Sequence, residues 1–336
     1  MSGKTTGILY IMTDSSRTNK EKAQILKEKI RKTLLGSKDK NGLFIQIVVY
    51  TLLICIGFVY IYPLLYMFIT SMMPLGDLLD SSIKWIPSQI YIKNYLEALS
   101  VIKFRNTIFS TLYIAFAPTL FQVVVCSMIG YGFAVYNFRG KKILMALMIF
   151  TFIIPPQITM MPTYVLYTDL KLLGSMKAFV LPAMLGQGFK SAIFILIYYQ
   201  FFRQIPKSLF DAAKIDGAGH FGAYFRIALP SAVPAVIVVF LFSFVWYWNE
   251  TYLVGLFLGN TGMGVKSSLT TLLLELTRFE QIYDQLYPVT QNSPNRINEA
   301  IKMAGTMIAI APLLIAYFFL QKYFVESVDR TGITGE

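Results

Sequence analysis

Charged residues are scarce in this chain of 336 residues. They make up 14% of the sequence, whereas ordinary soluble domains carry about 25%. Hydrophobic residues account for 55% and aromatic residues for 15%. This composition excludes an ordinary soluble protein and indicates an all-α integral membrane protein.

Residues suited to catalysis or metal binding are also few, with two cysteines and one histidine. Cys55 and Cys126 lie in apolar runs, where cysteine behaves as a small hydrophobic residue, so we expect no disulfide framework. We interpret His220 as a solvated loop residue rather than a pH sensor. Neither a metal site nor a nucleophilic catalytic site is expected.

A phosphate-binding loop of the form Gly-x-x-x-x-Gly-Lys-Ser/Thr is missing as well. The nearest match, residues 259–267, misplaces the lysine by one residue and falls on the predicted outer side of the membrane. We therefore expect that this chain is not an enzyme, does not hydrolyse ATP itself and binds no cofactor.

The net charge of +12 is concentrated at the N-terminus rather than spread over a soluble domain. Ten Lys/Arg and four Asp/Glu precede Asn41, which makes residues 1–42 a basic arm beside the first apolar run. This pattern is typical of a cytoplasmic flank and argues against nucleic-acid binding. The first apolar run is too long and begins too late to be a cleaved signal peptide.

Six stretches are long and apolar enough to span a lipid bilayer, which takes about 20 residues. Pro155, Pro156 and Pro162 predict that the third is bent or broken in its second half. The predicted spans are residues 43–72, 107–136, 143–164, 185–202, 231–258 and 300–324, within a membrane domain of residues 43–325.

Basic residues in the connections predict that both termini are cytoplasmic. Arg139, Lys141 and Lys142 follow the second span, and residues 203–230 carry four more Lys/Arg. On the outer side, residues 269–276 predict a short helix on the membrane surface, and residues 283–298 predict an exposed loop.

The inner loop, residues 203–230, contains more residues that start or stop helices than a simple connection needs. Ser208 and Asp211 form a capping-box pattern that predicts a short helix to about Asp216. Gly217 stands where a left-handed C-terminal cap belongs. A second short helix is expected from residue 219 or 220 to 226, with a stop at Pro230.

The side chains of this loop allow two interpretations. Ala212, Ala213 and Gly217 are small enough for another protein to approach closely, and Phe221, Tyr224, Phe225 and Ile227 offer apolar anchors. An amphipathic segment lying on lipid accounts for the same pattern equally well.

The pattern Asp211-Ala-Ala-x-x-x-Gly217, then nine residues, then Ile227-x-Leu229-Pro230 resembles the cytoplasmic signature loop of bacterial ABC importer permeases. Asp211 replaces the usual Glu. Residues 130–142, 154–164, 248–250 and 320–325 are similar to the maltose-type, carbohydrate-uptake branch. The resemblance covers roughly residues 43–330.

This resemblance implies a type I ABC importer fold with a coupling helix, in a bacterial inner or plasma membrane. The implied partners are a homologous permease, two ATPase subunits that bind ATP and Mg, and an external solute-binding protein. The tail, residues 326–336, resembles one that reaches between the ATPases. The implied coupling residues are Asp211, Ala212, Ala213, Gly217, Ile227, Leu229 and Pro230.

Polar and aromatic residues in the predicted spans are candidates for contact with a transported sugar: Gln157, Gln187, Trp246, Trp248, Asn249 and Glu250. In maltose-type importers the other permease can hold most of the substrate. A secondary transporter is the alternative, but the spans offer almost none of the midplane carboxylates that it would need. A membrane enzyme acting on lipid-linked sugars would need clustered acids or histidines, which the sequence lacks.

Overall fold

The computed structural model describes residues 34, 36–37, 40–83, 85–258, 269–288 and 297–332. They belong to two compact units, Met1–Tyr66 and Met67–Glu336. The described chain is almost entirely helical, apart from a two-residue antiparallel ladder between β1 (Gly36–Ser37) and β2 (Lys40–Asn41). Most of the basic arm, residues 259–267 and the last four residues of the tail lie outside the described residues.

Helix α3 (Leu43–Ser71) occupies the stretch expected for the first span. It is apolar around its whole circumference, and none of its most apolar 18-residue stretch is buried. A helix of this kind is normally covered by lipid or by other helices.

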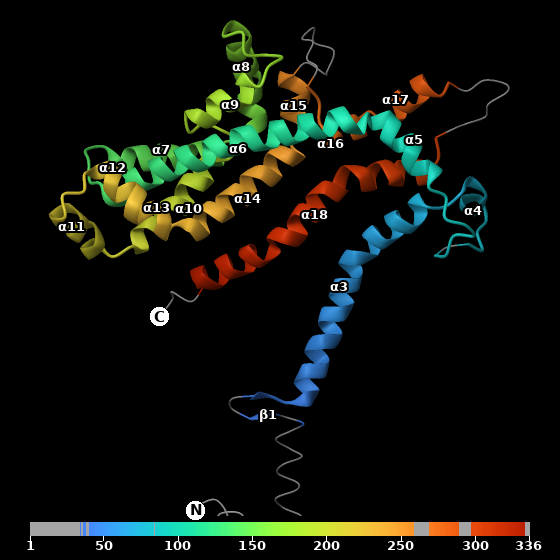
Figure 1. The fold of residues 1–336 in the computed structure, drawn as a ribbon, viewed down its shortest axis with the longest axis horizontal. Helices are drawn as coiled ribbons and strands as arrows, with labels where there is room; N and C mark the ends of the chain where they lie inside the picture. Colours follow the sequence, from blue (N-terminus) through green and yellow to red (C-terminus); the bar gives the residue numbers. More distant parts are fainter. Residues whose placement is uncertain are drawn as a thin grey trace, which may run out of the picture. The chain divides into compact units, whose positions relative to one another are not determined.

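Helix α6 is the central helix of the second unit, and α9, α10 and α14 pack against it (Figure 1). Helix α18 packs on α5 and α14. The bounds are α5 (Lys93–Ile102), α6 (Phe104–Val135), α9 (Lys177–Met184), α10 (Ser191–Gln204), α14 (Val233–Asn249) and α18 (Glu299–Gly332).

A glycine allows α6 and α10 to cross closely. A Cβ atom added to Gly130 would lie 2.6 Å from the Cβ of Tyr198 and 3.0 Å from the carbonyl oxygen of Ile195. Any larger residue would push the two helices apart. This crossing belongs to a buried cluster that includes Tyr131, Phe202 and Tyr224 and supports the inner loop.

Three described helices are long and apolar enough to cross a membrane: Leu43–Ser71, Phe104–Val135 and Glu299–Phe319. Two further pairs qualify only if each bent pair is one span. In the first pair, α7 (Lys141–Ile153) and α8 (Pro156–Asp169) meet at 100°, at the prolines that predicted a break.

Two of the expected continuous spans are interrupted. The predicted helix at residues 185–202 is wrong at its start, because α10 begins only at Ser191 and has 14 residues. The predicted helix at residues 231–258 is wrong at its end: α14 stops at Asn249, and α15 (Tyr252–Phe257) follows Glu250. Glu250 leaves the helix with a ψ of 100°, and its carboxylate oxygen accepts the N–H of Leu253, 2.8 Å away, in α15.

The outer segments differ from their predictions. The helix α16 (Leu272–Thr277) is real, but Leu272 and Leu274 are buried in the protein core rather than laid on the membrane surface. The loop predicted at residue 283 begins inside α17 (Phe279–Leu286), and Tyr283 is buried. The polar residues near Leu272, Leu274 and Tyr283 in the sequence gave no sign that these three side chains are buried. The segment after α3, also predicted to lie outside, contains a short helix, α4 (Leu75–Leu79).

Candidate functional site

The inner segment, residues 203–231, begins with the last two residues of α10, and its first own helix is α11 (Lys207–Ile215). The predicted capping box is wrong: Pro206 occupies the N-cap position, no side chain caps this end, and Ser208 already lies inside the helix. Proline is tolerated at the start of a helix because its missing N–H has no partner there, and the helix begins directly after Pro206, earlier than the hydroxyl pattern indicated.

Gly217 ends α11 as predicted, with a φ of +79°. The N–H of Ala218 donates to the carbonyl of Ala213 at 2.8 Å, and the N–H of Gly217 donates to that of Lys214 at 3.1 Å. This pair of bonds is the Schellman motif. Space around Gly217 is open, so its backbone angle, rather than crowding, requires glycine.

The second helical part of the inner segment is longer than predicted. It runs through α12 (His220–Ala223), a π-helical turn η1 (Tyr224–Ala228) and α13 (Leu229–Ser231). The predicted stop at Pro230 is therefore wrong, and the chain bends at Ala232 instead. A π turn shifts the hydrogen-bond pattern and so accommodates the N–H that Pro230 lacks.

Three contacts fix the inner segment to the C-terminal end of α6. The hydroxyl of Tyr224 shares a hydrogen bond with Ser127. The ring of Tyr131 packs 5.1 Å from that of Tyr224, centroid to centroid. His220 Nδ1 lies 3.0 Å from the hydroxyl of Tyr136, so this exposed histidine has a partner. A push on the inner segment would therefore reach α6 directly.

Of the residues predicted to couple, some are exposed and others serve the fold. Asp211, Ala212, Gly217 and Pro230 are exposed, Ile227 and Leu229 are half-buried, and Ala213 is buried. The exposed ion pair of Asp211 with Lys214, 3.6 Å apart, adds little stability.

Two residues of the inner segment were misjudged from the sequence. Ile215 is 87% exposed and shares a helical turn with Asp211 and Ala212, yet it was not singled out. Its apolar character at a solvated position was the available signal. Tyr224, predicted as an anchor for a partner, is buried and is an internal contact.

Buried polar groups join α6 to α10 and α14 midway along α6. Gln122 Nε2 donates to the carbonyl of Phe189 at 2.7 Å and to Ser191 Oγ at 2.8 Å. Ser243 Oγ donates to Gln122 Oε1 at 2.8 Å and lies 3.0 Å from Thr119 Oγ1. In an apolar interior these partners are costly to remove, so the network fixes the relative position of the three helices.

The predicted substrate residues do not form one pocket. Gln157, Gln187 and Asn249 are exposed, Trp246 and Glu250 are half-buried, and Trp248 is buried. Asn249 donates to the carbonyl of Val245 at 2.9 Å, so it is used within its own helix. Trp246 faces α10, where its ring lies 5.2 Å from that of Phe194, and it also lies 6.3 Å from the ring of Phe189, just before that helix.

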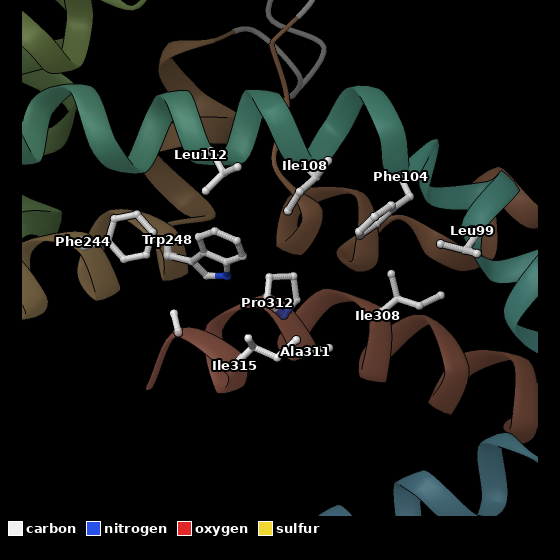
Figure 2. A pocket seen from close by; sticks show the side chains of 11 residues that line it. Leu99, Phe104, Ile108, Leu112, Phe244, Trp248, Ile308, Ala311, Pro312 and Ile315 are labelled. Atoms are coloured by element: carbon white, nitrogen blue, oxygen red, sulfur yellow. The ribbon is translucent and has the colours of Figure 1, made fainter. Parts of the chain in front are cut away.

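A cavity of about 540 Å³ lies between α5, α6, α14 and α18. Its lining is apolar, and Figure 2 shows the Trp248 indole directed between α6 and α18 toward Pro312. The buried indole N–H has no hydrogen-bond partner among the described residues. Since a sugar needs several polar partners, this cavity is not a sugar site.

Metal ligation finds no support in the described part of the chain, where His, Cys, Asp and Glu do not gather in groups of three or more.

Comparison with known proteins gives a consistent result. Residues 122–330 match the family described as binding-protein-dependent transport system inner membrane component. The chain is 27% identical over 283 residues to the arabinooligosaccharides transport system permease protein AraQ of Halalkalibacterium halodurans, covering 83% of this chain and 93% of AraQ.

It is also 27% identical over 297 residues to the polygalacturonan/rhamnogalacturonan transport system permease protein YtcP of Bacillus subtilis, covering 88% of this chain and all of YtcP. A solved bacterial ABC transporter involved in the import of alginate has the same fold, with a TM-score of 0.66 over 84% of this chain and 96% of that chain, at 20% identity.

Proposed function

Because the chain belongs to the family of binding-protein-dependent transport system inner membrane components, we propose that it forms half of the membrane pathway of an oligosaccharide importer. Relatives named for arabinooligosaccharides and for polygalacturonan and rhamnogalacturonan support this substrate class. The chain itself carries out no chemical step in this proposal. Its work is alternating access between the two sides of a bacterial inner or plasma membrane.

We assign six membrane crossings with both termini in the cytoplasm. Helices α3, α6 and α18 cross as single rods, and α7 with α8, α10 and α14 supply the other three. The basic residues at 139–142 and 203–226 support the inner placement of their loops. A helix of 14 residues spans only about 21 Å, so α10 crosses together with the chain before it.

The energy source is a pair of separate ATPase subunits, on which ATP and Mg bind, and a second permease chain completes the pathway. An external solute-binding protein delivers the sugar. Docking of an ATPase on the inner segment is carried by one observation: Asp211, Ala212 and Ile215 are exposed on a short helix whose neighbours are tied to α6 through Tyr224. Closure of the ATPases then pushes α6 without first deforming the segment.

Lipid is the other candidate for contact with the inner segment. It would leave the Asp211 carboxylate beside anionic headgroups without a cationic partner other than Lys214. A protein surface with its own polar groups suits this mixed face better.

A secondary transporter remains the alternative function. Helices α3, α6, α10 and α14 contain no Asp or Glu that could bind a coupling ion at the midplane.

Purification tests the proposal. The tagged chain, isolated from its host membranes, should bring down an ATPase in stoichiometric amount, and uptake into vesicles should require ATP inside. Uptake by the isolated chain driven by an ion gradient, without an ATPase, would favour the secondary transporter instead.

A further inference from the structure

Lys190 lies deep in the predicted membrane region. It precedes the first residue of α10, a helix of 14 residues whose last turn holds Arg203. At about 1.5 Å per residue, Lys190 is about 21 Å from that inner end, inside a hydrocarbon core about 30 Å thick. Gln122, which bonds to both neighbours of Lys190, lies in the middle of α6. The sequence carried this signal, a lysine inside a predicted span, but it was not singled out.

Lys190 has no counter-ion among the described residues. Its ammonium lies instead 5.7 Å from the ring centroids of Phe152 and of Phe189. The side chain is half-buried rather than enclosed. A cation in a membrane segment avoids lipid and faces either water or a partner of opposite charge. Lys190 therefore marks a polar side of this chain.

The backbone around Lys190 is clamped on both sides. The N–H of Phe189 donates to the hydroxyl of Tyr247 at 3.1 Å, and the Phe189 carbonyl and Ser191 Oγ both bind Gln122. Lys190 itself has a φ of +61°, which a lysine rarely adopts. The clamp holds the peptide in this conformation and fixes the point from which the side chain leaves the scaffold.

We propose that Lys190 binds the carboxylate of an acidic oligosaccharide on its way through the transport pathway, an assignment that rests on the proposed function. A half-buried cation in a membrane segment is costly without a counter-ion, and a carboxylate compensates it with a charge-assisted hydrogen bond stronger than one to a neutral hydroxyl. The rings of Phe152 and Phe189 flank the Lys190 ammonium, and the Trp246 ring lies 6.3 Å beyond, against Phe189. Their faces suit the apolar C–H faces of sugar rings.

Uptake of a matched pair of sugars by cells that carry the whole importer tests this assignment. The probes are radiolabelled trigalacturonate and the neutral galactotriose. We expect Lys190→Gln to reduce trigalacturonate uptake at least about tenfold, the range of a lost hydrogen bond between charged groups. Lys190→Arg should stay within about threefold of wild type, and galactotriose uptake should be the same in all three proteins.

Lys177→Gln is the matched control, because it removes the same charge and Lys177 is exposed at the start of α9. It should leave uptake of both sugars unchanged. Co-isolation of the ATPase is measured for the wild type and for every variant. If the wild-type chain brings down no ATPase, the importer assignment itself fails, and this result is distinct from failure of the Lys190 assignment.

Three results would overturn the assignment. They are unchanged trigalacturonate uptake in Lys190→Gln, equal loss of both sugars in that variant, and absence of trigalacturonate uptake by the wild type. The second would show that Lys190 pairs with a carboxylate of the second permease or supports the fold.

Discussion

The hydroxyl groups of Tyr224 and Ser127 share a buried hydrogen bond that ties the inner segment to α6. Ser127 also donates toward the carbonyl of Val124 at 3.0 Å, so it keeps a partner when Tyr224 is changed. The bond lies between the surface proposed to receive force and the helix that organises the membrane unit. Rigid attachment at this point would convert a push into helix movement rather than local bending.

Replacing Tyr224 by Phe tests this attachment, because the ring packing stays and only the hydroxyl is lost. We expect a loss of about 1 kcal/mol of stability and up to about a fivefold fall in sugar transported per ATP hydrolysed. The ratio is measured in vesicles holding the complete importer. Tyr113→Phe, at a side chain 52% exposed, is the control and should change nothing. An unchanged ratio in Tyr224→Phe would show that this hydrogen bond does not help to transmit movement from the inner segment to α6.

Gly217 offers a second test of the inner segment. Gly217→Ala places a Cβ in the left-handed region, at a cost of about 1–2 kcal/mol, although the surrounding space is open. Transport per ATP should fall while the protein still inserts. Gly219→Ala is the matched control, since Gly219 has a φ of −70° and equally open surroundings. Equal transport per ATP in the two variants would contradict a role for the left-handed conformation of Gly217.

Close packing of α6 on α10 makes a prediction about stability. Gly130→Ala would set its Cβ 2.6 Å from Tyr198 Cβ and should destabilise the protein by about 1–3 kcal/mol. Gly132→Ala meets nothing within 4 Å and should be neutral or slightly stabilising, since alanine favours helix over glycine. Thermal unfolding in detergent compares the two. A Gly130→Ala protein as stable as Gly132→Ala would show that the helices are not in this contact.

The polar network of Gln122 should be equally sensitive. Gln122→Leu removes partners from Ser243, Ser191 and the Phe189 carbonyl in an apolar interior, so we expect a loss of at least about 2 kcal/mol. Gln187→Leu, at an exposed position, serves as the control. Thermal unfolding distinguishes them, and a harmless Gln122→Leu would mean that the network does not hold the helices together.

The sequence predicted those parts of the fold that depend on neighbouring residues. Pro155 and Pro156 break the third span because proline cannot donate the helical hydrogen bond, whatever surrounds it. Gly217 caps α11 because a left-handed residue is needed there. Both inferences need no knowledge of distant residues.

The parts that depend on tertiary contact were not predictable in the same way. The break at Glu250 lies between two apolar stretches that only three polar residues separate, so the average hydropathy predicts one continuous helix. The burial of Tyr224 requires Ser127 and Tyr131, which are far away in sequence. The role of Lys190 depends likewise on Gln122 of another helix. The sequence therefore did not predict the role of a side chain whose orientation is set by contact with a second helix.

Cross-linking from Ile215 tests the central claim most directly. Ile215→Cys, placed in a chain with Cys55→Ser and Cys126→Ala, is treated with a short thiol-reactive photo-cross-linker in the intact complex. We predict an adduct with the ATPase subunit whose yield changes when ATP is added, and none from the control Leu79→Cys, which is 80% exposed and lies on the predicted outer side. Absence of an ATPase adduct from Ile215→Cys in a transport-active complex would contradict the account.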